Sequence, residues 1–91
     1  MHTKLTLEIS HTAEKDFQQI WESGLEQGID RASKTIQGIA HKIFSLEYLA
    51  HNYSEVPDCE LFGVPYRQII CDEHKVLFQV DKKHVQVLRI L

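Results

Sequence analysis

The last third of the sequence, from Gly63 to Leu91, constrains the fold more than any other part of the chain. It reads as three consecutive strands, 64–71, 75–80 and 84–91, joined by two short charged turns, 72–74 and 81–83. The strand segments are rich in β-branched or aromatic residues, and tight turns between such segments are typical of an antiparallel meander. Arg67 and Arg89 lie in the outer two segments. Because an arginine is costly to bury, each one is expected to face solvent, pair with a carboxylate or point at an anionic partner.

The length of the chain predicts a single domain, 1–91. A domain of this size buries only roughly 60–65% of its unfolded surface, so we expect modest stability alone, which favours a permanent partner. No run of about 18 apolar residues predicts a membrane span, and the first residues lead into a strand rather than a signal sequence. Cys59 and Cys71 have neither zinc-site spacing nor a disulfide framework around them. We therefore expect a cytoplasmic protein with reduced thiols, without a membrane association.

The formal net charge is −3 with histidines neutral. Domains whose main role is to grip nucleic acid usually carry a strong basic excess, so the charge argues against that class. The acidic residues are concentrated in the first predicted helix, and the last third of the chain is closer to balance. The charge therefore weakens a nucleic-acid interpretation without removing it.

The first third of the chain predicts a strand followed by a helix. Residues 4–9 alternate, with Leu5, Leu7 and Ile9 on one face, which is typical of a strand with one buried side. Thr12 is the predicted N-cap of a helix that begins at Ala13, with Glu14 and Asp16 in the first turn, where they complement the helix dipole. The apolar face of this helix is formed by Ala13, Phe17, Ile20, Trp21 and Gly24. Gly24 and Gly28 bracket the end of the helix.

A second, longer helix is predicted from an Asp30 cap to about Leu49. Its apolar stripe has a period of 3.6 and consists of Ala32, Ile36, Ile39, Ala40, Ile43 and either Leu46 or Phe44. The short connection between the helices predicts an antiparallel hairpin. Residues 50–62 are the least regular stretch. The resulting order is β-α-α-β-β-β, an α+β fold with a helical hairpin packed on one face of a sheet. The first strand lies either next to the last strand or between later ones.

Each candidate site residue also has a purely structural interpretation. Arg67 and Arg89 pair in that case with Glu60, Asp72, Asp81 or another carboxylate, and Lys75 is simply solvated beside a turn. The six histidines include no pair at metal-ligand spacing, so no metal site is predicted. His74 and His84 each lie beside a turn of the meander and are candidates to approach one another as an acid–base pair.

The whole pattern resembles the RelE/ParE toxin superfamily of bacterial type II toxin–antitoxin systems, over nearly the whole chain. The segment Ser10–Ile20 resembles the family's opening "S/T-x-x-A-x-x-D-h-x-x-I", and the segment Ser45–Pro57 resembles its "L…L…P" stretch. The ending is the most specific: Tyr66-Arg67, then Val76–Asp81, then Val85–Leu91, against "G-h-R", "Y-x-h-x-Y-x-h-x" and "h-x-V-h-R-h". These pieces occur in order and at the expected spacing.

The resemblance implies one of two activities. RelE-like members are ribosome-dependent endoribonucleases that cleave mRNA, and this activity would assign Arg67, Lys75 and Arg89 to stabilising phosphate charge. The C-terminal Tyr or His of those relatives is absent, because Ile90 and Leu91 occupy the end of this sequence. ParE-like members inhibit DNA gyrase by binding and need no acid–base pair. The acidic charge and the missing terminal residue favour the ParE-like branch and argue against enzymatic activity. The third alternative is an inactive relative that only binds antitoxin.

The resemblance also implies a cognate antitoxin protein, either in a hetero-oligomer or beside a homodimer, and no cofactor. Antitoxins of this superfamily wrap their toxins with helices and sometimes add a strand to the sheet edge. Trp21, on the border of the first helix's apolar face, is either part of the core or a marker of the antitoxin groove. Together with Arg67 and Arg89 it forms the predicted partner-binding set.

Overall fold

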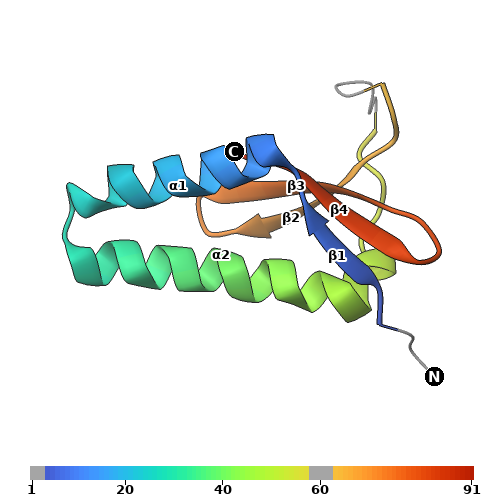
Figure 1. Ribbon diagram of the computed structural model, residues 1–91, viewed down its shortest axis with the longest axis horizontal. Coiled ribbons are helices and arrows are strands. Elements are labelled where there is room, and N and C mark those ends of the chain that lie inside the picture. The colour runs from blue at the N-terminus through green and yellow to red at the C-terminus, as the bar shows by residue number, and fades with distance from the viewer. Residues whose placement is uncertain (1–3, 58–62) are drawn as a thin grey trace.

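The computed structural model describes residues 4–57 and 63–91. Two antiparallel helices cover one face of a four-stranded sheet, so the predicted α+β architecture is confirmed (Figure 1). The elements in chain order are β1 (Thr6–Ile9), α1 (His11–Leu25), α2 (Ile29–Leu49), the 3₁₀ turn η1 (Ala50–Asn52), β2 (Arg67–Cys71), β3 (His74–Val80) and β4 (His84–Ile90).

The sheet has the order β1-β4-β3-β2, with β1 parallel to β4 and the other pairs antiparallel. Of the two positions open to the first strand, the structure therefore shows the one beside the last strand. The meander is confirmed, although its first strand begins at Arg67 rather than at Val64 and His74 already belongs to β3. The two-residue turn between β2 and β3 places Asp72 at φ 55°, a conformation that aspartate tolerates better than most residues.

Both helix caps differ from the prediction. Ser10, not Thr12, caps α1, because its Oγ accepts a hydrogen bond from the backbone N–H of Ala13 at 3.0 Å. The helix consequently starts two residues earlier, and Asp16 lies beyond the first turn. Gly28, not Asp30, precedes α2 and has φ 112°, which glycine adopts without strain. The predicted end of α2 at Leu49 is confirmed.

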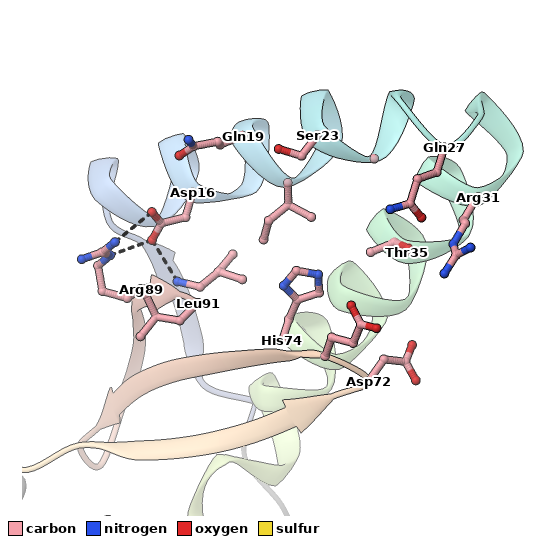
Figure 2. A pocket seen from close by; sticks show the side chains of 14 residues that line it. Asp16, Gln19, Ser23, Gln27, Arg31, Thr35, Asp72, His74, Arg89 and Leu91 are labelled. Carbon is pink, nitrogen blue, oxygen red and sulfur yellow. Dashed lines mark hydrogen bonds and ion pairs between the residues drawn. The ribbon is translucent and has the colours of Figure 1, made fainter.

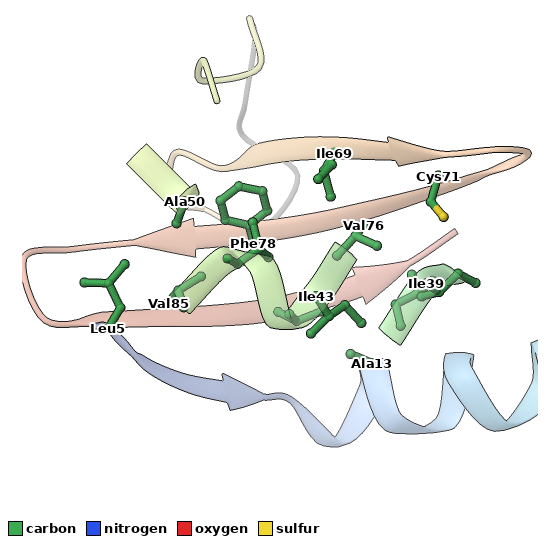
Figure 3. Packing of buried hydrophobic residues seen from close by; sticks show 13 residues of the cluster. Leu5, Ala13, Ile39, Ile43, Ala50, Ile69, Cys71, Val76, Phe78 and Val85 are labelled. Atoms are coloured by element: carbon green, nitrogen blue, oxygen red, sulfur yellow. The ribbon is translucent and has the colours of Figure 1, made fainter. Parts of the chain in front are cut away.

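The core lies between the helices and the sheet (Figure 3). Phe78 is its largest fully buried side chain, and the ring of Tyr53 meets it edge-on with ring centroids 6.0 Å apart. Of the alternatives for the α2 stripe, Leu46 is buried, whereas Phe44 is 59% exposed. Ile9 was expected on the buried face of β1 but is 40% exposed, because the strand ends there and the chain turns into α1. The buried cluster comprises Leu5, Ala13, Ile39, Ile43, Leu46, Ala50, Ile69, Cys71, Val76, Phe78, Val85, Val87 and Ile90.

The pairing register assigns a face to each strand residue. Directly opposed residues of an antiparallel pair share a face, so Arg67 lies on the helix side with Phe78, and His74 lies there with Cys71. Lys75, Leu77 and Gln79 alternate onto the opposite face. A register shift between Leu77 and Phe78 pairs Arg89 with Leu77, which places Arg89 on the face away from the helices.

Candidate functional site

Beyond the end of β1, the backbone of β4 forms hydrogen bonds with Ser10, the N-cap of α1, and with Asp16 of α1. The backbone N–H of Ser10 donates to the carbonyl of Val87 at 2.9 Å, and its Oγ donates to the carbonyl of Leu88 at 2.9 Å. One and a half turns later, Asp16 Oδ2 accepts the backbone N–H of Ile90 at 3.0 Å. These contacts provide hydrogen-bond partners for backbone groups of β4 beyond the point where β1 ends. Ser10 and α1 therefore take the place of a neighbouring strand along the last part of β4.

Asp16 also holds Arg89 in a two-point ion pair (Figure 2). Arg89 Nε donates to Oδ2 at 2.7 Å, and Nη2 donates to Oδ1 at 3.1 Å. The hydrogen bond from Arg89 is the main cause that lowers the pKa of the Asp16 carboxyl, and the backbone bond from Ile90 acts in the same direction against the effect of burial. The same pairing raises the pKa of the Arg89 guanidinium. Both groups are therefore charged at neutral pH, and their charges offset one another.

A groove of about 880 Å³ opens beside this ion pair, between α1, the start of α2 and the turn that joins β2 to β3. Its lining mixes charges of both signs, with Asp72 and Glu73 at one end and Arg89 at the other. His74 projects between them toward the helices, as its register position requires (Figure 2). The groove suits a mixed polar and apolar partner surface better than a uniformly charged ligand.

Arg67 lies away from this groove. Its Nη1 donates to the backbone carbonyl of Tyr53 and, at 3.4 Å, to that of His51. His51 lies within the 3₁₀ turn η1 and Tyr53 directly follows it, and Glu55 forms a β-bridge with Arg67. The guanidinium therefore ties the loop after α2 to the start of β2. Among the described residues it pairs with carbonyl oxygens and not with Asp72 or Asp81, whereas Glu60 lies outside the part of the chain that the structure describes.

Lys75 is exposed on the face away from the helices and is a diagonal neighbour of Arg89 across β3 and β4. The three predicted cations thus do not converge. Arg89 forms its ion pair with Asp16 of α1, and Arg67 binds backbone carbonyls on the helix side of the sheet. Of the three, Lys75 is the one that projects from the face away from the helices.

The histidines do not form a pair. His74 begins β3, whereas His84 lies beside the far end of that strand, where Val85 opposes Val80. The two are roughly 20 Å apart along the strand, so the suggested acid–base pair is wrong. His84 instead approaches Asp81 at 3.6 Å within its own turn. Within residues 4–57 and 63–91, no three His, Cys, Asp or Glu side chains gather as metal ligands.

The remaining candidates have simpler surroundings. Trp21 is half-buried on α1. Cys71 is buried as a free thiol, and burial is the main cause that raises its pKa, so it is a poor nucleophile. Cys59 and Glu60 lie outside the described residues. No helix in the described part of the chain is long and apolar enough to cross a membrane.

The role of Asp16 in binding Arg89 has no local sequence signal. The sequence pattern assigns it to the helix dipole, and the carboxylates that it names for Arg89 are Glu60, Asp72 and Asp81, with another carboxylate left open. Asp16 and Arg89 are 73 residues apart in sequence. The register shift, which sets Arg89 on the face away from the helices, has no signature in the strand pattern, because a single inserted residue leaves the hydrophobic run intact.

Comparison with known proteins identifies the architecture. Neither the protein-family models nor the curated proteins give a match to this sequence. Among solved structures, one chain of the "Chromosomal ParDE TA system from P. aeruginosa" is similar to this chain with a TM-score of 0.78 and 24% sequence identity. The similarity covers 97% of this chain and 95% of that one. The chain therefore has the fold of a protein in a ParDE toxin–antitoxin structure, which confirms the fold that the sequence motifs predicted.

Proposed function

We propose that this protein is the toxin component of a type II toxin–antitoxin module and that it acts, like ParE, by binding and inhibiting DNA gyrase. The carrying observation is the shared fold over nearly the full length of both chains with a member of a ParDE toxin–antitoxin structure. Fold alone hosts many functions, so the arrangement of the charged side chains supplies the second support.

The arrangement of the cations favours binding over RNA cleavage. Attack of a ribose 2′-hydroxyl on its phosphate needs proton-transfer groups and cations that meet at one phosphate. Arg89 is neutralised by Asp16, Arg67 is engaged with backbone carbonyls on the helix side, and Lys75 projects alone. A ribosome-dependent endoribonuclease would require these side chains to rearrange.

The proposed contact residues are Arg89, Trp21 and Arg67. Arg89 Nη1 makes no hydrogen bond within the described residues, and the side chain is 36% exposed, so a fixed guanidinium edge faces a partner. Trp21 offers a half-buried aromatic surface on α1. Arg67 contributes by holding the loop that follows η1. A cognate antitoxin neutralises the protein in the cytoplasm by covering part of these surfaces.

Expression of the chain in bacteria without any antitoxin tests the proposal. The expected result is growth arrest with early loss of DNA synthesis and induction of the DNA-damage response. Early loss of protein synthesis instead supports the endoribonuclease. Soluble folded protein with no growth defect assigns the chain to an inactive relative that only binds antitoxin.

Purified protein in a gyrase supercoiling assay separates direct from indirect effects. The wild-type chain is expected to inhibit supercoiling, and Arg89→Ala is expected to lose at least about tenfold in potency, equivalent to about 1.4 kcal/mol of binding. Lys82→Ala, in the exposed turn between β3 and β4, is the matched control. Equal inhibition by all three proteins removes Arg89 from the contact surface.

A further inference from the structure

β2 is an edge strand of the sheet: the order β1-β4-β3-β2 gives it β3 as its one neighbouring strand (Figure 3). An exposed edge offers backbone N–H and C=O groups to any strand that approaches it, and proteins usually cover such an edge or place charges along it. The residues of β2 that follow Arg67 carry no charge; they are Gln68, Ile69, Ile70 and Cys71. Most of β2 therefore lacks the charged side chains that often protect an edge.

The strand register shows which backbone groups of β2 point outward. Lys75 and Leu91 exchange two hydrogen bonds of 2.8 Å, so the backbone groups of Lys75 face β4. The direction alternates along a strand, so those of Val76 face β2, where Val76 pairs with Ile69. The backbone groups of Ile69 therefore face β3. The residues of β2 whose backbone groups face outward are Gln68 and Ile70.

A short extended segment lies against the first half of this edge, and we call residues 53–56 the guard segment. Glu55 forms an antiparallel bridge with Arg67. The N–H of Val56 donates to the carbonyl of Tyr66 at 2.9 Å. The guard segment therefore occupies the place beside the start of β2 that an added strand would need.

The second half of the edge is short and open. The antiparallel bridge places Ser54 beside Gln68, which leaves Ile70 as the next outward-facing residue. Within residues 4–57 and 63–91, Ile70 makes no backbone hydrogen bond outside the sheet, and 59% of its surface is exposed. At Asp72, with φ 55°, the chain turns back into β3. A strand of at least about three residues does not fit beside a single outward-facing residue.

Arg67 holds the guard segment in place. Its Nη1 donates to the backbone carbonyl of Tyr53, the first residue of the segment, and to that of His51. The ring of Tyr53 packs edge-on against Phe78, with ring centroids 6.0 Å apart. The next two residues of the segment are exposed, so few other contacts oppose its release.

We propose that the guard segment prevents a second copy of this chain from pairing along β2, and that Arg67 is the positioning residue that holds it there. When the segment is released, both outward-facing residues of β2 are open. Two copies then pair antiparallel about a two-fold axis at Ile69, with Gln68 of each copy opposite Ile70 of the other. A second copy is the occupant that fits, because the strand is complementary to itself and this register places no like charges opposite one another. The inference goes beyond the proposed function and does not depend on gyrase.

Two variants release the guard segment by different routes. Arg67→Ala removes the guanidinium contacts, and Val56→Pro removes the N–H that donates to Tyr66. In sedimentation equilibrium of the full chain over a series of concentrations, the wild type is expected to stay monomeric and both variants to shift to dimers. Arg31→Ala, at the exposed start of α2, is the matched arginine control and should stay monomeric.

A second substitution in each variant identifies the surface that associates. Because the N–H of Ile70 points away from β3, Ile70→Pro deletes it without breaking the hydrogen bonds between β2 and β3, and proline is tolerated at such edge positions. Added to Arg67→Ala or to Val56→Pro, it is expected to restore the monomer. Ile70→Lys, which places a charge on the edge, should do the same and replaces the proline variant if that one unfolds.

Amide hydrogen exchange locates the contact residue by residue. The N–H of Ile70 should exchange quickly in the monomer and slowly in the dimer, because it then donates to the other copy. The N–H of Ile69 faces β3 and should be protected in both.

Three results overturn the proposal: folded guard variants that stay monomeric, dimers that persist with Ile70→Pro or Ile70→Lys, or a wild-type dimer with a protected Ile70 N–H. If a guard variant precipitates, recovery of soluble protein by the second substitution supports the proposal, and continued precipitation overturns it. None of these results bears on gyrase inhibition, which the supercoiling assay measures separately.

Discussion

Removing Asp16 and Arg89 singly and together measures how strongly α1 is held to the edge of β4. Asp16→Ala deletes the acceptor of three hydrogen bonds, at 2.7, 3.1 and 3.0 Å. A hydrogen bond to a charged group contributes about 1.5–3 kcal/mol, and an orphaned buried donor costs about 1–3 kcal/mol. Because Arg89 is 36% exposed, its freed guanidinium can be hydrated, which reduces the loss. We expect Asp16→Ala to lower the free energy of unfolding by about 2–4 kcal/mol.

Arg89→Ala should cost less, about 1–2 kcal/mol, because Asp16 still accepts the backbone N–H of Ile90. Asp16→Asn keeps one oxygen for that N–H and loses the charge, so its cost should fall between those of the two alanine variants. The coupling free energy between Asp16→Ala and Arg89→Ala should be about 1–2 kcal/mol, since the double variant no longer contains a pair to break.

Urea unfolding followed by circular dichroism gives these values when all five proteins, the wild type and its four variants, share one m-value. A coupling energy below about 0.3 kcal/mol, within the error of additivity, would refute the two-point ion pair as a stabilising contact. An Asp16→Ala variant no less stable than Arg89→Ala would refute the strand-completing role of the carboxylate.

Three further predictions concern the same region of the fold. Because the pKa of Asp16 is lowered from its ordinary value of 3.8, its contribution to the free energy of unfolding is complete above that value and is lost as pH falls through the folded-state pKa. The free energy of unfolding should therefore fall more steeply with decreasing pH below about pH 4. Asp16→Asn should make this decrease shallower. Ser10→Ala should cost about 1–2 kcal/mol in thermal unfolding, because Ser10 caps α1 and also bonds β4, whereas Thr12→Ala should change stability by less than about 0.5 kcal/mol; equal costs would restore Thr12 as the cap. Gly24→Ala should destabilise by about 1–3 kcal/mol, since its Cβ would lie 3.1 Å from that of Ala32; a more stable variant would show that the helices can separate freely.

The fold could be predicted because its signals are local. Strand alternation, the 3.6-residue period of α2 and the short turns of the meander each depend on neighbouring residues, and together they specify an α+β arrangement. The parallel pairing of β1 with β4 was left open, since strand order depends on contacts between residues about 80 positions apart. The caps were misplaced because Ser10 and Thr12 are both good N-cap residues, and only the position of β4 decides between them.

The candidate site was predicted less well for a related reason. Pairing with a carboxylate was one of the alternatives for Arg89 and is confirmed, whereas a backbone carbonyl was not among the alternatives for Arg67. Their actual partners are the carbonyl of Tyr53 and the carboxylate of Asp16. A backbone carbonyl carries no sequence signal, and a helix aspartate is ordinary until the tertiary structure brings it to the sheet.

The central position of β4 has a consequence for how the molecule is made. Both of its neighbours precede it in the chain, and β1 finds no strand partner until residues 84–87 have left the ribosome. The helical hairpin can form early from local contacts, but its apolar side then stays uncovered until the meander closes over it. We expect folding to be completed only at the end of synthesis, so a chain interrupted before β4 would be a target for proteases rather than a partly active protein.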